Sequence, residues 1–391
     1  MKRAVILTGH FPNQKRRPSL LWVSHHLQKS GWHVTHVTVG FSWISQVLGD
    51  PRLTSLDDKP CTGVWHPNPN LTTIFGYAPV HPINLRQTWL TRLAQTTWPL
   101  FTAYWERRLQ GPLRQADLAM CESGPPILLA PTLAHHAQQA QRIYRVNDDI
   151  RLLNAPDGLI AAEQRNLECF TRISTASPVL AKRFAKHTHV TLDPMGIPKS
   201  LVNHPHADPY KHSPNCKIVV CAGTTQLDVE AIMRIATSRP NWNVHILGRL
   251  KKLPPKRGNL FWHGEQNFEK TLAHIAHADI GLSPYLDKPG IEYQVTNSNR
   301  MLLYRHFGLP ILGPDRLCSS GNPSIFGYNT PNAMDLCEEF PHRPEDIPDW
   351  SELARRLVQK GVTDPPSEVS TDPATISKSR VKTVPALASS A

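Results

Sequence analysis

The chain has 391 residues, 40% of them hydrophobic, which is typical of a protein with two folded α/β domains and a sizeable core in each. Its formal charge of +12 predicts an anionic partner, such as a phosphate group, a nucleic acid or an acidic membrane surface. Seven scattered cysteines without a C-x-x-C pair argue against a zinc site or a disulfide framework, and favour reduced thiols in the cytoplasm.

The first forty residues predict a β-strand, an α-helix and a second β-strand. The expected ranges are a buried strand over 4–8, a helix over 20–29 and a strand over 33–39. The opening apolar run is too short for a signal peptide, and no run approaches the roughly 20 residues of a membrane span. The first turn lacks G-x-G-x-x-G, which makes a nicotinamide or flavin site improbable. The cations Arg16 and Arg17 in this turn either bind an anion or form a solvated basic loop.

Residues 86–115 are rich in tryptophan and arginine and follow a segment, 50–85, that we expect to be irregular. Trp89, Leu93 and Trp98 predict a partly amphipathic helix that lies in a membrane interface. The alternative is a core helix with a charged outer face, which is the commoner outcome for this spacing.

A third strand and its turn carry the first candidate catalytic group. We expect a strand over 118–121, a helix over 135–141 and a strand over 142–146 that leads into Asn147, Asp148 and Asp149. A carboxylate at the carboxyl end of a strand is a candidate general base, but the local alternative is a helix N-cap. The triplet is not the D-x-D of metal-dependent sugar transferases. Whether Glu163 on the next helix reaches this turn stays open.

The rest of the chain predicts the end of one domain, a linker and a second domain. The ranges are strands over 173–176 and 188–192, a helix over 177–186, a linker over 193–201, strands over 217–222, 243–247, 260–263, 279–283 and after 308, and helices over 227–236, 271–277, 298–307 and 351–360. Strands that alternate with helices indicate a parallel, doubly wound sheet. Residues 361–391 lack apolar anchors, and we expect a disordered tail.

Three polar positions in the second domain are expected at the carboxyl ends of its strands, where such sheets bind ligands. These are Glu265, Tyr285 and the helix start at 297–300, and we expect a long polar loop between Tyr285 and that helix. Because a helix N-terminus offers free N–H groups and Arg300 adds a full charge, the segment predicts a nucleotide-diphosphate site.

Several motifs together resemble the GumK-type glucuronosyltransferases of xanthan assembly (glycosyltransferase family 70). The matching pieces are His10 with Arg16–Arg17, VHPINLRQTWL (80–90), ESG (122–124), YRVND (144–148), SPVLA (177–181), AGTTQLD (222–228), HGE (263–265), SPY (283–285), NSNRMLLYRHFGLP (297–310), FGYNTPNA (326–333) and DWS (349–351). The resemblance implies a GT-B fold, two Rossmann-like doubly wound domains with an interdomain cleft. It implies an acceptor-binding domain over 1–195 and a nucleotide-sugar-binding domain over 196–360.

The resemblance also implies roles for individual residues. Asp148 matches the family's catalytic base. The donor-binding set is Thr225, Glu265, Gln266, Tyr285, Ser298, Asn299 and Arg300, and the acceptor-binding set is His10, Arg16 and Arg17. Arg300 replaces a family Lys that meets the diphosphate, and Asp149 replaces a Gly, so that two carboxylates crowd one turn and repulsion is expected to raise one pKa. Changes at Thr225, Asn299 and Leu303 leave UDP as the expected nucleotide and the sugar open.

The implied activity is an inverting transfer of glucuronic acid from UDP-glucuronate to a lipid-pyrophosphate-linked oligosaccharide in exopolysaccharide assembly. No metal or other cofactor is expected, because Arg300 and a helix N-terminus would neutralise the diphosphate. The protein is expected on the cytoplasmic face of the inner membrane, peripheral to it and without a nucleic-acid partner. The alternatives are the same fold with another UDP-sugar, a basic nucleic-acid-binding protein, and a lipid-binding scaffold without catalysis.

Overall fold

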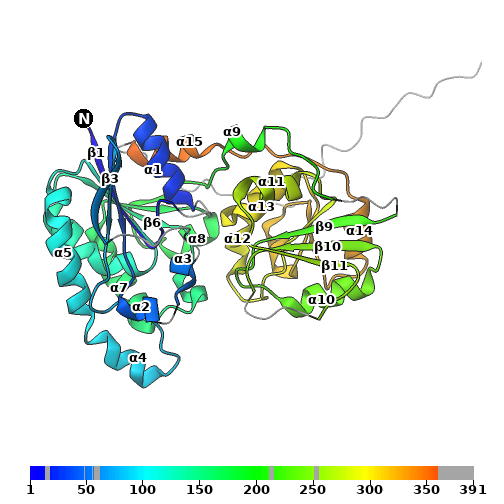
Figure 1. The fold of residues 1–391 in the computed structure, drawn as a ribbon, viewed down its shortest axis with the longest axis horizontal. Coiled ribbons are helices and arrows are strands. Elements are labelled where there is room, and N and C mark those ends of the chain that lie inside the picture. Colours follow the sequence, from blue (N-terminus) through cyan, green and yellow to red (C-terminus); the bar gives the residue numbers. More distant parts are fainter. Residues whose placement is uncertain are drawn as a thin grey trace, which may run out of the picture.

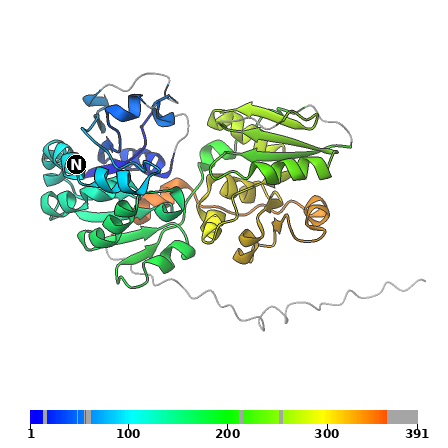
Figure 2. The same ribbon diagram turned by 90° about the horizontal axis from the view of Figure 1, so that it is seen from below.

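The computed structural model describes residues 1–13, 18–47, 49–54, 56, 62–210, 215–250 and 255–359. Arg16, Arg17 and the tail 361–391 lie outside these residues. The described chain forms two α/β domains, each built around a mainly parallel sheet, and Figures 1 and 2 show them side by side. This is the doubly wound architecture that the alternation of strands and helices predicts.

The N-terminal sheet has eight strands in the order β3-β4-β2-β1-β5-β6-β7-β8. Their bounds are β1 Arg3–Thr8, β2 His33–Thr38, β3 Gly63–Asn68, β4 Leu71–Phe75, β5 Leu118–Glu122, β6 Gln141–Val146, β7 Arg172–Thr175 and β8 Val190–Leu192. All neighbours are parallel except β3 and β4. The order reverses between β1 and β5, so the loops after β1, β5 and β6 gather at one edge, where parallel sheets bind ligands.

The C-terminal sheet has six parallel strands in the order β11-β10-β9-β12-β13-β14. Their bounds are β9 Lys217–Ala222, β10 Trp242–Leu247, β11 Leu260–Gly264, β12 Ile280–Leu282, β13 Ile311–Gly313 and β14 Ile325–Gly327. The winding reverses between β9 and β12. The loops after these two strands therefore form the second candidate binding edge.

The helices cover both faces of the two sheets (Figure 1). Their bounds are α1 Ser19–Lys29, α2 Trp43–Val47, α3 Pro51–Thr54, α4 Thr88–Gln95, α5 Trp98–Arg114, α6 Ala130–His136, α7 Asp157–Asn166, α8 Pro178–Arg183, α9 Lys199–Val202, α10 Val229–Ser238, α11 Phe268–Ala276, α12 Gln294–Asn297, α13 Asn299–His306, α14 Ala333–Glu339 and α15 Trp350–Val358. Short 3-10 helices lie between them, among them η2 Ile150–Leu153 and η4 Ile291–Tyr293.

The last described helix returns to the first domain. Helix α15 lies in the range that we expected for the C-terminal domain, but it packs against α1 (Figure 1). Arg172 of β7 donates hydrogen bonds to the carbonyls of Arg356 and Gln359 at 2.9 and 3.4 Å, which caps the end of this helix. Sequence periodicity predicts the helix correctly but carries no information on the sheet that it covers.

The chain therefore crosses between the domains twice. The predicted linker, 193–201, runs beside the returning segment, and Ile197 forms a parallel bridge with Asp349. A Cβ on Gly196 would lie 2.8 Å from the backbone of Asp349, so glycine permits this close approach. Movement of one domain against the other must involve both segments.

Three local predictions are wrong. Residues 50–85 are not irregular throughout, because β3 and β4 lie there and β4 is fully buried beside β2. The helix expected over 135–141 ends at His136, and Gln141 already belongs to β6. The polar loop expected after Tyr285 contains η4 and α12, whose apolar side chains are buried.

Candidate active site

Asp148 lies at the carboxyl end of β6 and faces the second domain. Its side chain is partly buried, and Oδ1 accepts a hydrogen bond of 3.0 Å from the phenol of Tyr293 in η4. Burial raises the pKa of Asp148 above its ordinary value, and the negative charges of Glu122 and Asp149 add to that rise. The bond from Tyr293 and the charge of His10 oppose it. A carboxylate with a raised pKa beside a domain boundary has the properties of a general base.

The neighbouring Asp149 has a structural role. Its Oδ1 accepts a hydrogen bond of 3.0 Å from the backbone N–H of Arg151, so that Asp149 is the N-cap of η2. Its carboxylate also pairs with the guanidinium groups of Arg151 and Arg183, and these contacts hold the pKa of Asp149 below its ordinary value. The cap that the sequence offered as an alternative for Asp148 is therefore made by Asp149. Repulsion between the two carboxylates contributes to the raised pKa of Asp148, but burial is the larger cause.

Glu163 is connected to this turn through one arginine. Its Oε2 accepts a hydrogen bond of 2.6 Å from Arg183, which also contacts Asp149. Its Oε1 accepts a second bond of 2.6 Å from the phenol of Tyr144. Glu163 is fully buried, so these contacts through Arg183 hold the turn that contains Asp148 and Asp149 in place.

A buried polar network supports Asp148 from the other side. Glu122, at the end of β5, accepts hydrogen bonds from the hydroxyl of Thr8 and, at 2.8 Å, from the side-chain amide of Asn147. The guanidinium of Arg145 donates a hydrogen bond of 3.0 Å to Oδ1 of Asn147. Burial lowers the pKa of Arg145 to about 10. This network joins β1, β5 and β6, and it keeps a negative charge close to Asp148.

The two domains meet at this turn. The side-chain amide of Asn297 in α12 donates a hydrogen bond to the carbonyl of Asn147. The amide of Gln226, which follows β9, donates a bond of 3.2 Å to the carbonyl of Leu152. Together with the bond between Tyr293 and Asp148, these contacts place the loops of the C-terminal domain directly against the candidate base.

Arg300 organises the second half of the site. It lies in the first turn of α13, it is 6% exposed, and its guanidinium stacks on the ring of Tyr285 at 4.0 Å. It donates hydrogen bonds to the phenol of Tyr285 at 3.0 Å and to the carbonyls of Gly223 and Thr225 at 3.0 and 3.3 Å. Gly223 has a φ of 105°, which only glycine adopts without strain. Arg300 therefore fixes the conformation of the loop after β9, and its guanidinium places a positive charge next to that loop.

The remaining predicted donor residues lie around this centre. Ser298 accepts a hydrogen bond of 2.7 Å from the phenol of Tyr285, and no side chain within the described residues caps the first turn of α13. Glu265, after β11, pairs with Arg249 at 3.0 Å, while Gln266 donates to the carbonyl of His263. Both lie at a strand end two strands away from β9.

The predicted donor residues Thr225 and Asn299 and the predicted acceptor residue His10 remain to be placed. Thr225 and Asn299 are exposed. His10 follows β1, and its carbonyl accepts hydrogen bonds from His36 at 3.0 Å and from Thr38 at 2.9 Å. The structure thus brings His10 to the same edge of the sheet as Asp148. Arg16 and Arg17 lie outside the described residues.

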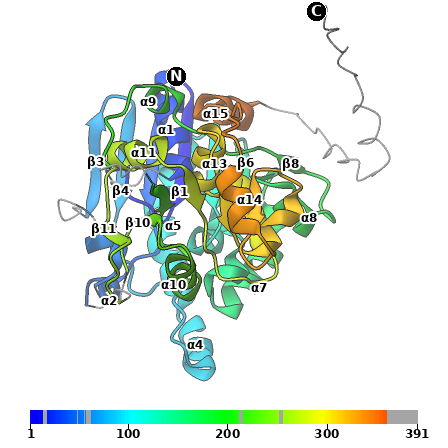
Figure 3. The same ribbon diagram turned by 90° about the vertical axis from the view of Figure 1, so that its right-hand side faces the viewer.

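The Trp-rich segment divides into two helices with different surroundings. Helix α5 is a core helix, since Trp98, Phe101 and Trp105 are buried. Helix α4 projects from the N-terminal domain (Figure 3), and its Trp89 and Leu93 are 65% and 61% exposed. No helix within the described ranges is both long and apolar enough to cross a membrane. The core-helix alternative is therefore correct for α5, which includes Trp98, and the membrane interface stays a prediction for α4.

Several site residues could not be found from the sequence. Tyr293 lies in a stretch, GIEYQVTN, whose composition is that of a loop. The sequence predicts Asn297, at the end of this stretch, as part of the donor-site helix start, but it does not indicate the contact of Asn297 with the other domain. Alternation of Ile291, Tyr293 and Val295 was the available signal of burial. Glu122 stands in a matching motif, yet nothing local indicates that it contacts Asn147.

Comparisons with known proteins agree with this architecture. Residues 6–176 match the family model described as "Glucuronosyltransferase GumK, N-terminal domain". The UDP-glucuronate:glycolipid 2-beta-glucuronosyltransferase of Xanthomonas campestris pv. campestris is 24% identical over 330 residues, which are 84% of this chain and 80% of that protein.

Solved structures support the fold alone. The apo structure of OtsA has a TM-score of 0.59 and 9% identity, and the match covers 91% of this chain and 94% of that chain. A trehalose-6-phosphate structure from E. coli bound with UDP-2-fluoro glucose has a TM-score of 0.56 and 11% identity over the same shares. The chain therefore has the GT-B fold, and its residues 6–176 are similar to the N-terminal domain of the GumK-type glucuronosyltransferases.

Proposed function

We propose that this protein transfers glucuronic acid, with inversion, from UDP-glucuronate to a lipid-pyrophosphate-linked oligosaccharide in exopolysaccharide assembly. The observation that carries the proposal is the environment of Asp148, a partly buried carboxylate that Tyr293 of the opposite domain contacts through Oδ1. The name of the Xanthomonas relative supplies the donor and the class of acceptor, a glycolipid.

In the proposed reaction Asp148 is the general base. Tyr293 holds Oδ1, and we assign Oδ2 to the acceptor hydroxyl. Asp148 takes the hydroxyl proton while the oxygen forms a bond to the anomeric carbon from the face opposite UDP. The bond between that carbon and the β-phosphate oxygen breaks, and UDP leaves with the electron pair. Attack from the opposite face inverts the configuration, and a raised pKa makes Asp148 a stronger base for this step.

The departing UDP is assigned to the loops after β9 and β12 and to the start of α13. The uncapped first turn of α13 offers N–H groups to an anion, and Arg300 supplies a buried positive charge behind the loop. Thr225, Glu265, Gln266, Tyr285, Ser298 and Asn299 complete the proposed donor set. We propose that these groups make a catalytic metal unnecessary for the transfer.

The acceptor lipid requires contact with a membrane, and the N-terminal domain has a suitable end. Helices α2 and α4 lie at the same end of this domain (Figures 1 and 3). Trp43 and Val47 of α2 and Trp89 and Leu93 of α4 are exposed, with Arg92 beside them. Apolar side chains among cations suit an anionic lipid surface. We propose peripheral binding at the cytoplasmic face of the inner membrane, with His10, Arg16 and Arg17 near the lipid pyrophosphate.

A donor panel tests the proposal against its nearest rival. UDP release is measured with UDP-glucuronate, UDP-glucose and UDP-galactose in the presence of lipid-linked acceptor. The proposal predicts release from UDP-glucuronate alone. Release from another UDP-sugar would retain the reaction type and overturn the donor, whereas liposome binding without any release would indicate a scaffold that lacks catalysis.

A further inference from the structure

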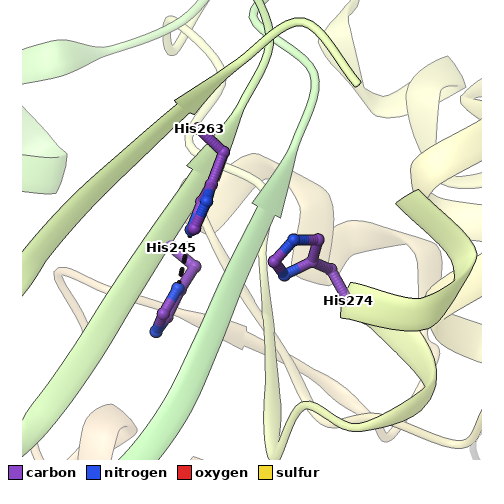
Figure 4. Close-up of side chains that lie close together, drawn as sticks. All are labelled: His245, His263 and His274. Atoms are coloured by element: carbon purple, nitrogen blue, oxygen red, sulfur yellow. Dashed lines mark hydrogen bonds between the residues drawn. The ribbon is translucent and has the colours of Figure 1, made fainter. Parts of the chain in front are cut away.

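Three histidines form a cluster on the face of the C-terminal sheet that packs against α11 (Figure 4). His245 lies on β10, His263 on β11 and His274 on α11, and one ring nitrogen of each lies within 4.8 Å of the other two. Nδ1 of His245 and Nε2 of His263 are 2.8 Å apart. Nδ1 of His274 is buried and has no hydrogen-bond partner among the described residues.

Two aromatic side chains flank the cluster. The ring of Phe261 stacks on that of His245, with centroids 4.7 Å apart. The ring of Tyr210 lies 4.6 Å from His245 and 5.1 Å from His274. His245 and His274 are buried, while His263 is partly exposed and gives the cluster its contact with solvent. An unpaired imidazole nitrogen in such surroundings costs free energy unless a ligand occupies it.

Burial favours the neutral form of the three rings. Burial lowers the pKa of His245 to about 3 and that of His274 to about 4, and the pKa of His263 is lowered as well. No carboxylate belongs to the cluster within the part of the chain that the structure describes. Neutral imidazoles are the form that binds transition metals.

We propose that His245, His263 and His274 bind one divalent transition-metal ion of the Zn²⁺ class. Imidazole ligands favour Zn²⁺ and its neighbours over Mg²⁺ or Ca²⁺, which prefer oxygen. Three protein ligands leave a fourth tetrahedral position for water or another small ligand. The sequence gives no sign of this site, because the ligands come from three elements and match no local zinc motif.

Small movements are enough to form the site. Two nitrogens that share a tetrahedral Zn²⁺ lie about 3.3 Å apart, from a metal–nitrogen length of about 2.0 Å. His245 and His263 must therefore separate slightly, and His274 must approach them by rotation of its side chain. The ion would replace the hydrogen bond between His245 and His263 and supply a partner for the buried nitrogen of His274.

The proposed ion has a structural role and is independent of the transfer reaction. It would fasten the edge strand β11 and its neighbour β10 to α11, and β11 ends next to Glu265 of the proposed donor set. Metal bound only by the folded state raises stability by mass action. The proposal therefore predicts an effect on the C-terminal domain whether or not the protein transfers glucuronic acid.

The test is Zn²⁺ titration of the full-length, metal-stripped protein without an affinity tag, followed by calorimetry and by thermal unfolding. We expect one ion per chain and a higher Tm with Zn²⁺. Co²⁺ should give the visible absorption of a tetrahedral site, whereas Mg²⁺ should change nothing. The variants His274→Gln and His263→Gln should each bind Zn²⁺ at least about tenfold more weakly than the wild type does. Addition of Zn²⁺ should not raise the Tm of either variant.

His187→Gln is the matched control, since His187 lies in the N-terminal domain and pairs with the exposed Glu168. Circular dichroism establishes whether each variant is folded. If His274→Gln does not fold, His263→Gln alone provides the test. Equal binding by the wild type and both cluster variants would overturn the proposal, as would the absence of any binding by the wild type. UDP release measured on the same samples separates this result from a failure of the proposed transfer.

Discussion

The phenol of Tyr293 lies 3.0 Å from Oδ1 of Asp148, and the two residues belong to opposite domains and are 145 positions apart in the chain. This contact means that the candidate base is fully oriented only when the domains are in contact. Asn297 reinforces the arrangement with its bond to the carbonyl of Asn147. Base orientation and domain closure are thereby coupled.

Replacement of Tyr293 by phenylalanine should shift the pH profile of activity. The bond from Tyr293 lowers the pKa of Asp148, so its loss leaves burial and Glu122 to raise that pKa further. The base must be deprotonated to act, and the acid limb of kcat/KM should therefore move to higher pH. Tyr77→Phe, at a partly buried tyrosine of the N-terminal domain, is the control. A slower enzyme with an unmoved acid limb would mean that Tyr293 contributes only to packing.

Asp149→Asn should destabilise the N-terminal domain at neutral pH. Asparagine can still cap η2, so the loss comes from the ion pairs with Arg151 and with the largely buried Arg183, and it should be roughly 2–3 kcal/mol. The pKa of Asp149 is lowered in the folded state, and this stabilisation is complete above the unfolded pKa of about 3.9 and is lost as the pH falls through the folded value. Urea unfolding across this range should show that the wild type and the variant converge in acid. A constant difference at all pH values would contradict the assigned ion pairs.

Arg300→Ala should raise the KM for the donor by at least about tenfold, because it removes charge-assisted hydrogen bonds to the loop that is assigned to UDP. Arg300→Lys retains the charge, but a single ammonium group cannot bind the carbonyls of Gly223 and Thr225 in the geometry of a guanidinium. We therefore expect an intermediate KM. Arg234→Ala, at an exposed position of α10, is the control. Steady-state kinetics of UDP release measure the effect. An unchanged KM in the alanine variant would place the diphosphate elsewhere.

The double variant Trp89→Glu, Leu93→Glu should lose binding to anionic liposomes by at least about tenfold, since two exposed apolar side chains of α4 become charged. Leu336→Glu makes the same change at an exposed leucine of α14 in the other domain, and it should bind as the wild type does. Cosedimentation measures the partition, and UDP binding monitors the fold. Equal partition of both variants would remove α4 from the membrane surface.

The sequence predicts several strands of the buried sheets well, because their side chains are mainly apolar. The range 217–222 coincides with β9, whose residues are almost all buried. Strand β4 escapes prediction because its sequence, LTTIF, contains two threonines that are buried in the sheet, and because proline and asparagine surround it. A polar residue inside a buried strand depends on its neighbours in space, which local sequence does not contain.

The candidate site likewise contains residues that the sequence predicts and residues that it does not. Asp148 and Tyr285 are accessible to sequence reasoning because they follow recognisable strands and stand in motifs that resemble a known family. Tyr293 is not, because its significance arises from a contact between domains. Arg300 shows a third case, since sequence indicates its charge, while the structure adds that its donors hold the loop carbonyls at Gly223 and Thr225.

The central claim is that Asp148 is the base of a glucuronic acid transfer. The most direct measurement compares UDP release from UDP-glucuronate by the wild type and by Asp148→Asn, with lipid-linked acceptor and with UDP affinity measured in parallel. If Asp148 is the base, release falls by at least about a hundredfold in the variant while UDP affinity is unchanged. Release at the wild-type rate from Asp148→Asn would mean that another residue is the base.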